Sequence, residues 1–423
     1  MRPRRVLTLF GVALHAAVAA RGQSAPAAES ALTIGTTHTY PSRILGESRP
    51  YLVYRPTTEG RLPVIVLLDG DGHFHHTTGA VQFLIAQGRM PPALVVAVPN
   101  TGDRTRDLTP ATSDTTFRTA GGADRMLAFL ADELLPHIDS AYPTEGFRVL
   151  IGHSFGGLFA VHAWLSRPEV FRAYVAISPS LWWDGERLID SVAGRLSRTP
   201  APGGWLYATM GEQEPLANMV GPFRRAAAVL SERAPASLWW RFTLMAGEDH
   251  GSTPHRSTYD ALEAIFEPLR VPPDDSIIAA GVAGVDRHFA ALRARFGFPA
   301  RTPELAVNRL GYLLLQDSSR HAAAIEAFRE NVRRHPTSAN TYDSLGDGYR
   351  TLGHLAAAQA CYGAAARVGR AAPDAGGVVR NAIIAPVSAG KMIEVARELG
   401  RPPVDPAVIP ESVTTVCLAG TER

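Results

Sequence analysis

The segment Gly152-His153-Ser154-Phe155-Gly156 has the residue types of a serine nucleophile in a tight turn. A serine hydroxyl attacks a carbonyl only when a base takes its proton and its geometry is fixed. A sharp turn between a strand and a helix fixes the geometry, and small residues on either side let the backbone bend that tightly. Residues 149–151 are typical of a buried strand and residues 158–165 of a helix. The segment therefore predicts a nucleophile elbow, with Ser154 attacking a carbonyl carbon.

The general base should be a histidine that follows the last strands of the chain. His250 stands in such a place, after a predicted strand, and Gly251 lets its loop turn freely. His255, five positions later, is the competing candidate. We predict that His250 is the base, and we expect activity to fall when it becomes protonated at acidic pH.

An acid would hold the tautomer of that histidine and stabilise its cationic form. The segment after another predicted strand offers Glu212 and Glu214. We favour Glu214 and keep Glu212 as the alternative, because spacing alone does not orient them. Asp249 and Asp184 are weaker alternatives, and a Ser-His dyad without an acid also remains open.

Two backbone amides should stabilise the developing oxyanion. One is the amide of Phe155, and the other should come from the loop at residues 69–73, where we choose Asp71. The acids and histidines of this loop, Asp69, Asp71, His73, His75 and His76, also have the types of metal ligands. A calcium-binding loop would need a glutamate at its twelfth position, where Ala80 stands. We predict no metal and no cofactor.

Three further residues are candidates for substrate binding. Trp182 and Trp183 follow a predicted strand end, where they would either form a wall for a catecholate or another ring or pack under a loop. Arg104 would either bind an anionic group of the substrate or, like Arg106, form a salt bridge to Asp107.

The elements that must position these residues are short apolar runs separated by amphipathic stretches. Continuous apolar runs are typical of strands covered on both faces. Residues 36–54 instead predict an edge hairpin, with alternating apolar and polar residues at 49–54. The pattern predicts an α/β fold, a mostly parallel sheet flanked by helices, with function at the carboxyl ends of its strands. The predicted parallel strands are 63–68, 93–98, 147–151, 173–177, 205–210 and 239–245.

The rest of the chain divides into four segments. Basic residues before the apolar run 6–20 predict a secretory signal peptide over 1–22, with a retained membrane anchor as the alternative. The catalytic domain should cover 32–270. A linker and a helix should follow over 271–301, and the last segment should be a partly helical tail over 373–423. Residues 302–372 follow the 34-residue tetratricopeptide pattern. The positions that match it are Ala324, Phe328, Tyr342, Leu345, Gly346, Tyr349, Ala358 and Tyr362.

Composition excludes several classes of protein. The chain has 423 residues, of which 46% are hydrophobic and 19% charged, so it is not a disordered chain. Its formal net charge of +2 does not indicate a nucleic-acid binder. Cys361 and Cys417 are too few for a disulfide framework or a cysteine metal cluster.

Several of these segments together resemble the esterase family of α/β-hydrolases. They include 42–51, 68–70, 104–110, 152–157, 177–183 and 249–252. The sequence is most similar to the siderophore (enterochelin and salmochelin) esterase-like branch, over about residues 36–268. The resemblance implies an α/β-hydrolase fold and a serine esterase, but it does not identify the ester. Some members of that branch lack a clear third triad acid, and the wider family includes acyltransferases.

We therefore predict an exported, periplasmic or secreted serine hydrolase that cleaves carboxylic esters through an acyl-enzyme on Ser154. The alternatives are an acyltransferase that uses the same acyl-enzyme and an inactive scaffold whose repeats bind a partner. The expected partners are a small-molecule ester and, through the repeats, a protein or a second copy of the chain. We expect no nucleic acid and no membrane span in the mature chain.

Overall fold

A computed structural model describes residues 31–56, 60–197, 203–215, 218–269, 275–296, 302–373 and 381–420. The predicted signal peptide and the start of the predicted linker, residues 271–274, lie outside these ranges. Residues 34–423 form one compact unit.

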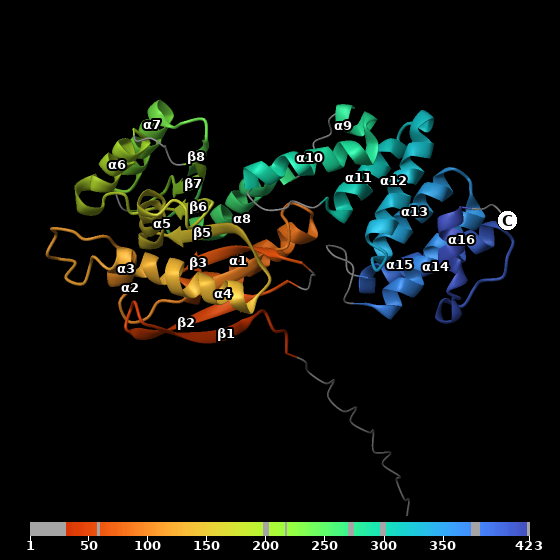
Figure 1. Cartoon of the computed structure of the whole chain (residues 1–423), viewed down its shortest axis with the longest axis horizontal. Coiled ribbons are helices and arrows are strands. Elements are labelled where there is room, and N and C mark those ends of the chain that lie inside the picture. Colours follow the sequence, from red (N-terminus) through yellow and green to blue (C-terminus); the bar gives the residue numbers. More distant parts are fainter. Residues whose placement is uncertain are drawn as a thin grey trace, which may run out of the picture. The chain divides into compact units, whose positions relative to one another are not determined.

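An eight-stranded sheet lies at the centre of the α/β region (Figure 1). Its spatial order is β1-β2-β4-β3-β5-β6-β7-β8, with β1 and β2 forming an antiparallel hairpin that also pairs antiparallel with β4. The other neighbours are parallel, as predicted. The strands are β1 (Thr36–Ser42), β2 (Glu47–Tyr54), β3 (Leu62–Leu68), β4 (Leu94–Val98), β5 (Thr144–His153), β6 (Ala173–Ile177), β7 (Gly204–Gly211) and β8 (Leu238–Met245).

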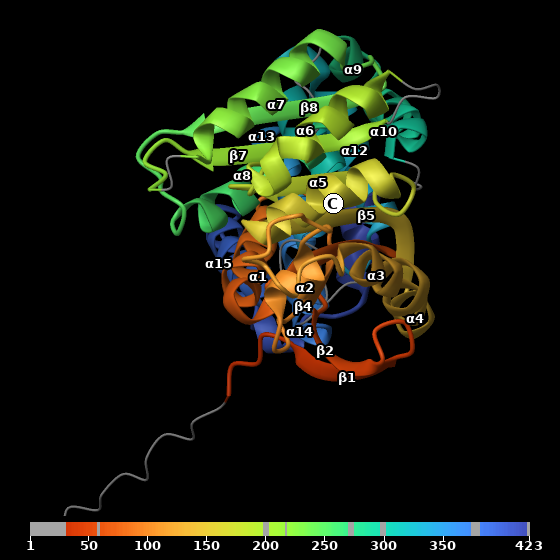
Figure 2. The same cartoon turned by 90° about the vertical axis from the view of Figure 1, so that its left-hand side faces the viewer.

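Helices cover both faces of the sheet (Figure 2). Along β3, Val64 and Val66 belong to one hydrophobic core while Ile65 and Leu67 belong to the other. This is why the central strands are continuous apolar runs. The helices of this region are α1 (Gly70–Ala86), α2 (Arg104–Leu108), α3 (Ala123–Ala128), α4 (Leu135–Ala141), α5 (Phe155–Ser166), α6 (Trp183–Leu196), α7 (Val220–Arg233) and α8 (Thr253–Phe266); a π-helical segment, Phe129–Leu134, joins α3 to α4.

The core of the α/β region continues into the helices that follow it. Phe296, at the end of α10 (Gly281–Phe296), stacks on Trp205 of β7 with ring centroids 5.2 Å apart. Leu310 and Leu314 of α11 (Glu304–Leu315) belong to the same core. The predicted domain boundaries at residues 271 and 302 therefore stay a prediction, because packing is continuous across them.

The carboxyl-terminal region is helical, as expected. Two of its helix pairs place a glycine of one helix against a ring of the next, and neither glycine has room for a Cβ: Gly311 meets Phe328, and Gly346 meets Tyr362. The two pairs are separated by nearly the predicted period. The helices are α9 (Asp275–Ala279), α12 (His321–Arg334), α13 (Ala339–Thr351), α14 (Leu355–Ala371), α15 (Asn381–Glu398) and α16 (Ser412–Ala419), in addition to α10 and α11. In the predicted tail we expected one helix near 389–399; α15 is longer, and α16 was not predicted.

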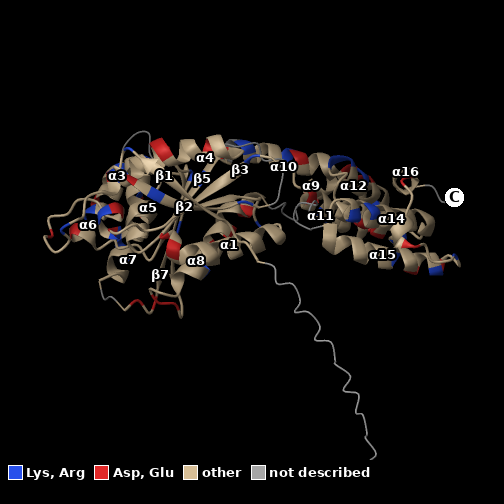
Figure 3. Cartoon of the chain, turned by 90° about the horizontal axis from the view of Figure 1, so that it is seen from below, with Lys and Arg blue, Asp and Glu red and all other residues tan. Residues whose placement is uncertain are grey.

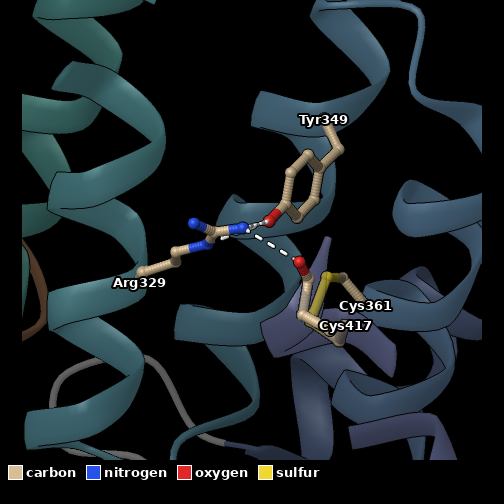
Figure 4. Close-up of a disulfide and its surroundings, with 5 residues drawn as sticks. Arg329, Tyr349, Cys361 and Cys417 are labelled. Atoms are coloured by element: carbon tan, nitrogen blue, oxygen red, sulfur yellow. Dashed lines mark hydrogen bonds between the residues drawn. A yellow bond between two sulfur atoms is a disulfide. The ribbon is translucent and has the colours of Figure 1, made fainter. Parts of the chain in front are cut away.

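A disulfide joins Cys361 of α14 to Cys417 of α16 (Figure 4). Beside it, Arg329 donates hydrogen bonds to the Tyr349 hydroxyl, at 2.7 and 3.0 Å, and to the Ala419 carbonyl at 3.3 Å. The cysteine count excluded a framework of several disulfides, but we did not predict this single bond.

Basic and acidic side chains are interspersed along the chain (Figure 3), in agreement with its small net charge. Within the described ranges, no helix has the length and apolar character to cross a bilayer.

Candidate active site

Ser154 lies in a strained turn between the end of β5 and the start of α5. Its φ of 60° and ψ of −115° are unusual for a residue with a side chain. The Ser154 amide donates to the Ile177 carbonyl of β6 at 2.9 Å, and the Ser154 carbonyl accepts from Leu158 at 2.9 Å. These hydrogen bonds anchor both sides of the strained residue.

Close approaches to neighbouring atoms, backbone atoms in the case of Gly152 and Gly157, require glycines around Ser154. A Cβ at Gly152 would overlap the Gly156 backbone. A Cβ at Gly157 would lie 2.8 Å from the Ile177 carbonyl oxygen, and one at Gly156 would lie 3.0 Å from the Asp69 carboxylate. The arrangement therefore has the features of the predicted elbow.

His250 lies beside Glu214. His250 Nδ1 and Glu214 Oε1 are 2.9 Å apart, with the Glu214 side chain fully buried and that of His250 25% exposed. The ring N–H is not aligned with the carboxylate, and within the described residues neither Glu214 oxygen has an aligned donor. The short distance nevertheless makes His250 the partner of Glu214, since a buried carboxylate needs a partner and a small ring rotation would align the pair.

The backbone explains why Glu214 reaches His250. Gly211, at the end of β7, packs so tightly against Glu248 and Asp249 that it has no room for a Cβ. The Gln213 amide then donates to the Glu248 carbonyl at 3.0 Å. These contacts place the segment after β7 directly beside the His250 loop.

The other acids considered have different surroundings. Glu212 is exposed. Asp249 accepts the amides of Gly251 and Ser252, both at 2.9 Å, and these bonds lower its pKa. Asp184 accepts from the Ser113 amide at 3.1 Å. Glu214 is thus the acid that the fold brings to His250, while its catalytic role stays a prediction.

Both predicted oxyanion donors lie at helix amino termini. Phe155 begins α5, and Asp71 lies in the first turn of α1. The Gly72 and His73 amides donate to the Asp69 carbonyl at 3.0 and 3.1 Å, whereas the Asp71 amide precedes them and has no acceptor from its own helix. Such amides attract negative charge.

Arg104 connects the loop after β3 to the elbow. Its guanidinium donates to both carboxylate oxygens of Asp69, at 2.5 and 2.9 Å, and to the His153 carbonyl at 2.9 Å. Burial disfavours the charged form of Asp69, but the bonds and charge of Arg104 outweigh it, so the pKa of Asp69 is lowered. Arg104 therefore pairs with Asp69 instead of the predicted Asp107, and a substrate contact of Arg104 stays a prediction.

Asp107 has other partners. It pairs with Arg106 at 2.7 Å, as expected, and with the buried Arg49 at 2.6 Å. The Arg49–Asp107 ion pair joins α2 to β2 of the edge hairpin.

The two tryptophans belong to an aromatic cluster beside Phe155. Trp183 is buried, and its indole N–H donates to the Pro110 carbonyl at 3.2 Å, so its packing role is clear. Trp182 is half-buried and lies 6.3 Å, ring to ring, from Phe155. Phe117 contacts both tryptophans, with centroids 6.1 and 4.7 Å away, and sequence reasoning had not selected it.

His153 was the other omission. We assigned it no role from the sequence, but its Nε2 lies 2.9 Å from the His250 carbonyl oxygen and the two rings are 4.6 Å apart. Its position directly before the nucleophile was the only feature of the sequence that could have drawn attention to it.

The histidines of the loop after β3 contact one another. His73 Nδ1 and His76 Nε2 are 3.0 Å apart, which requires one nitrogen to donate to the other. Across the described part of the chain, no group of three His, Cys, Asp or Glu side chains has a metal-binding arrangement.

Comparison with known proteins places this region in a protein family. Residues 42–252 match the family described as "Putative esterase". The chain is 35% identical over 141 residues to the siderophore triacetylfusarinine C esterase of Aspergillus fumigatus, an alignment that covers 31% of this chain and 48% of that protein. It is 31% identical over 182 residues to the ferri-bacillibactin esterase BesA of Bacillus subtilis, covering 37% of this chain and 62% of that protein.

A solved structure extends the similarity. An IroE-like serine hydrolase from Shewanella oneidensis superposes with a TM-score of 0.58 at 27% identity, covering 69% of this chain and 98% of that one. The alignments to the two curated relatives span about half to three fifths of their lengths. Residues 42–252 therefore match the esterase family and are homologous to the siderophore esterases.

Proposed function

We propose that this protein hydrolyses carboxylic esters, with Ser154 as nucleophile, His250 as general base and Glu214 as the acid that orients it. The observation that carries the proposal is the strained Ser154 in a turn whose flanking glycines leave no space for side chains. The 2.9 Å contact between His250 and Glu214 supports the assignment of base and acid.

The reaction would proceed in two steps. His250 takes the Ser154 proton while Oγ bonds to the carbonyl carbon, and the Phe155 and Asp71 amides stabilise the oxyanion. The ester C–O bond then breaks, and His250 returns the proton to the leaving alcohol. In the second step water loses a proton to His250 and attacks the acyl-enzyme, which releases the carboxylic acid and restores the Ser154 hydroxyl.

Siderophore esters are the substrate class that we propose. The relatives named above are esterases of siderophores. Trp182 and Phe117 could provide an aromatic surface near Phe155 for such a ligand.

We also propose that the protein is exported. The basic and apolar character of residues 1–22 supports a signal peptide. The disulfide between Cys361 and Cys417 supports an oxidising compartment such as a periplasm.

For the helical region we propose tetratricopeptide-like helix pairs that bind a protein partner or a second copy. The matching contacts of Gly311 with Phe328 and of Gly346 with Tyr362 support this reading.

Active-site labelling combined with an ester panel tests the central proposal. A fluorophosphonate probe should label the wild type and not Ser154→Ala. Acyl, feruloyl, acetyl-sugar and iron–siderophore esters should then be compared by kcat/KM, with siderophore esters the best substrates. An unlabelled, correctly folded wild type would contradict the serine mechanism, whereas labelling with preference for another ester would contradict only the substrate class.

A further inference from the structure

We infer that His153 is a positioning residue for the general base, holding the His250 loop through a hydrogen bond from its imidazole to the His250 carbonyl. The inference rests on the proposed function, since it assigns a role relative to Ser154 and His250. It gives a task to a side chain that the proposed mechanism does not use.

The His250 carbonyl receives two side-chain donors. His153 Nε2 lies 2.9 Å from this oxygen, and Thr253 Oγ1 donates to it at 3.2 Å. Thr253 is fully buried and also contacts Ser178 Oγ at 3.1 Å, next to the end of β6. The base is thus held at its backbone by His153 and Thr253 and at its ring by Glu214.

The chemistry of the contact fixes the tautomer of His153. A carbonyl oxygen only accepts hydrogen bonds, so Nε2 must carry the proton. Burial, followed by the nearby His250 and His73, lowers the pKa of His153 to about 3, so the ring is neutral at working pH. It can therefore donate without placing a second positive charge beside a base that must itself become cationic.

The position of His153 links the two loops that must meet. It is the last residue of β5 and directly precedes Ser154, and its own carbonyl accepts from Arg104 at 2.9 Å. The strand that positions the nucleophile therefore also positions the loop that carries the base. Because catalysis depends steeply on the separation of nucleophile and base, loss of this hydrogen bond should slow the chemical steps more than it weakens substrate binding.

Three variants test the inference. His153→Leu removes the donor and introduces an apolar side chain of similar size. His153→Gln keeps an N–H in reach of the carbonyl and is the matched control. Thr253→Val removes the second donor with little change in shape. Each is assayed for kcat and KM on the best ester of the panel, with thermal unfolding and fluorophosphonate stoichiometry as checks of folding.

We expect His153→Leu to lower kcat about 10- to 100-fold with KM changed less than about threefold, and His153→Gln to recover most of the loss. Thr253→Val should lower kcat in the same direction by a smaller factor. If His153→Leu does not fold, the other two variants still test the inference. The kcat of His153→Gln should stay close to that of the wild type, and the kcat of Thr253→Val should be lower.

Three results would overturn the inference and leave the proposed esterase function intact. They are a folded His153→Leu protein with wild-type kcat, a His153→Gln protein as slow as the Leu variant, and a His153→Leu protein whose main change is a higher KM. A folded wild type that neither reacts with the probe nor turns over any ester would instead overturn the proposed function, and the inference with it.

Discussion

At the scale of single residues, the site depends on how the fold distinguishes chemically similar side chains. Glu212 and Glu214 are two positions apart, yet one is exposed and the other is buried against His250. Asp249 carries the same charge beside His250, but its carboxylate accepts hydrogen bonds from loop amides. Residue type alone does not distinguish these three carboxylates, whereas their contacts in the fold do.

The two glutamates provide a matched pair for mutation. Glu214→Gln should lower kcat by about 100-fold or more, because the amide no longer stabilises the His250 cation that forms in the reaction. Glu212→Gln should leave kcat unchanged, since this side chain is exposed. Steady-state kinetics on one ester measures both, and equal losses in the two variants would refute the assignment of Glu214.

Acid should destabilise the fold through two partly buried histidines, His76 and His153. Burial lowers the pKa of His153 to about 3 and, together with His73, that of His76 to about 4. In the unfolded chain these groups titrate near 6.5, so between about pH 6.5 and 3 the unfolded state binds more protons. The free energy of unfolding should therefore fall as pH falls, by up to about 1.4 kcal/mol per pH unit for each group.

Urea unfolding between pH 7 and pH 4 measures this slope. His153→Gln should give a shallower decline than the wild type, and His75→Gln, which replaces an exposed histidine, should match the wild type. Identical slopes for wild type and His153→Gln would show that His153 does not contribute to the acid sensitivity.

At the scale of elements, the elbow depends on glycines where backbone meets backbone. The end of β5 and the first turn of α5 approach so closely that Gly152 has no space for a methyl group. The turn is further fixed by the bond from the Ser154 amide to β6. A strand, a turn and a helix thus hold a φ that serine ordinarily avoids.

Alanine substitutions in β5 test this requirement. Gly152→Ala should lower the free energy of unfolding by about 3 kcal/mol or more and abolish labelling of Ser154, because the added methyl overlaps the Gly156 backbone. Gly146→Ala, in the same strand but facing open space, should change stability by less than about 1 kcal/mol. Chemical unfolding and probe labelling measure both effects. Normal labelling of a stable Gly152→Ala protein would contradict the argument.

At the scale of the whole molecule, the hydrolase core and the helical region share packing. Phe296 lies against Trp205 and Phe266, with ring centroids 5.2 and 6.3 Å apart, and α11 adds leucines to the same core. The helical region therefore stabilises the sheet from one face. Its far end is fastened by the Cys361–Cys417 disulfide.

Removal of that disulfide should affect stability and not chemistry. In the chain-entropy description a loop closed over 56 positions is worth about 4 kcal/mol, so Cys361→Ser with Cys417→Ser should lower the unfolding midpoint. Since no residue of α14 or α16 is in the proposed site, kcat should stay within about twofold of the wild type at a temperature where both are folded. A large loss of kcat would show that the helical region contributes to the site.

The sequence by itself determined the sheet, the elbow turn and the loop that carries His250, the proposed base. The apolar runs from residue 63 to residue 245 became parallel strands, because residues buried on both faces must be apolar and this pattern is local. Ser154 and His250 could be selected as candidates because strand ends are visible in the sequence. Only the tertiary structure separated Glu214 from Glu212, paired Arg104 with Asp69, joined the two cysteines and turned His153 toward the His250 carbonyl. These contacts join segments up to 97 positions apart, and the direction of a side chain across such a distance depends on the packing of whole strands and helices.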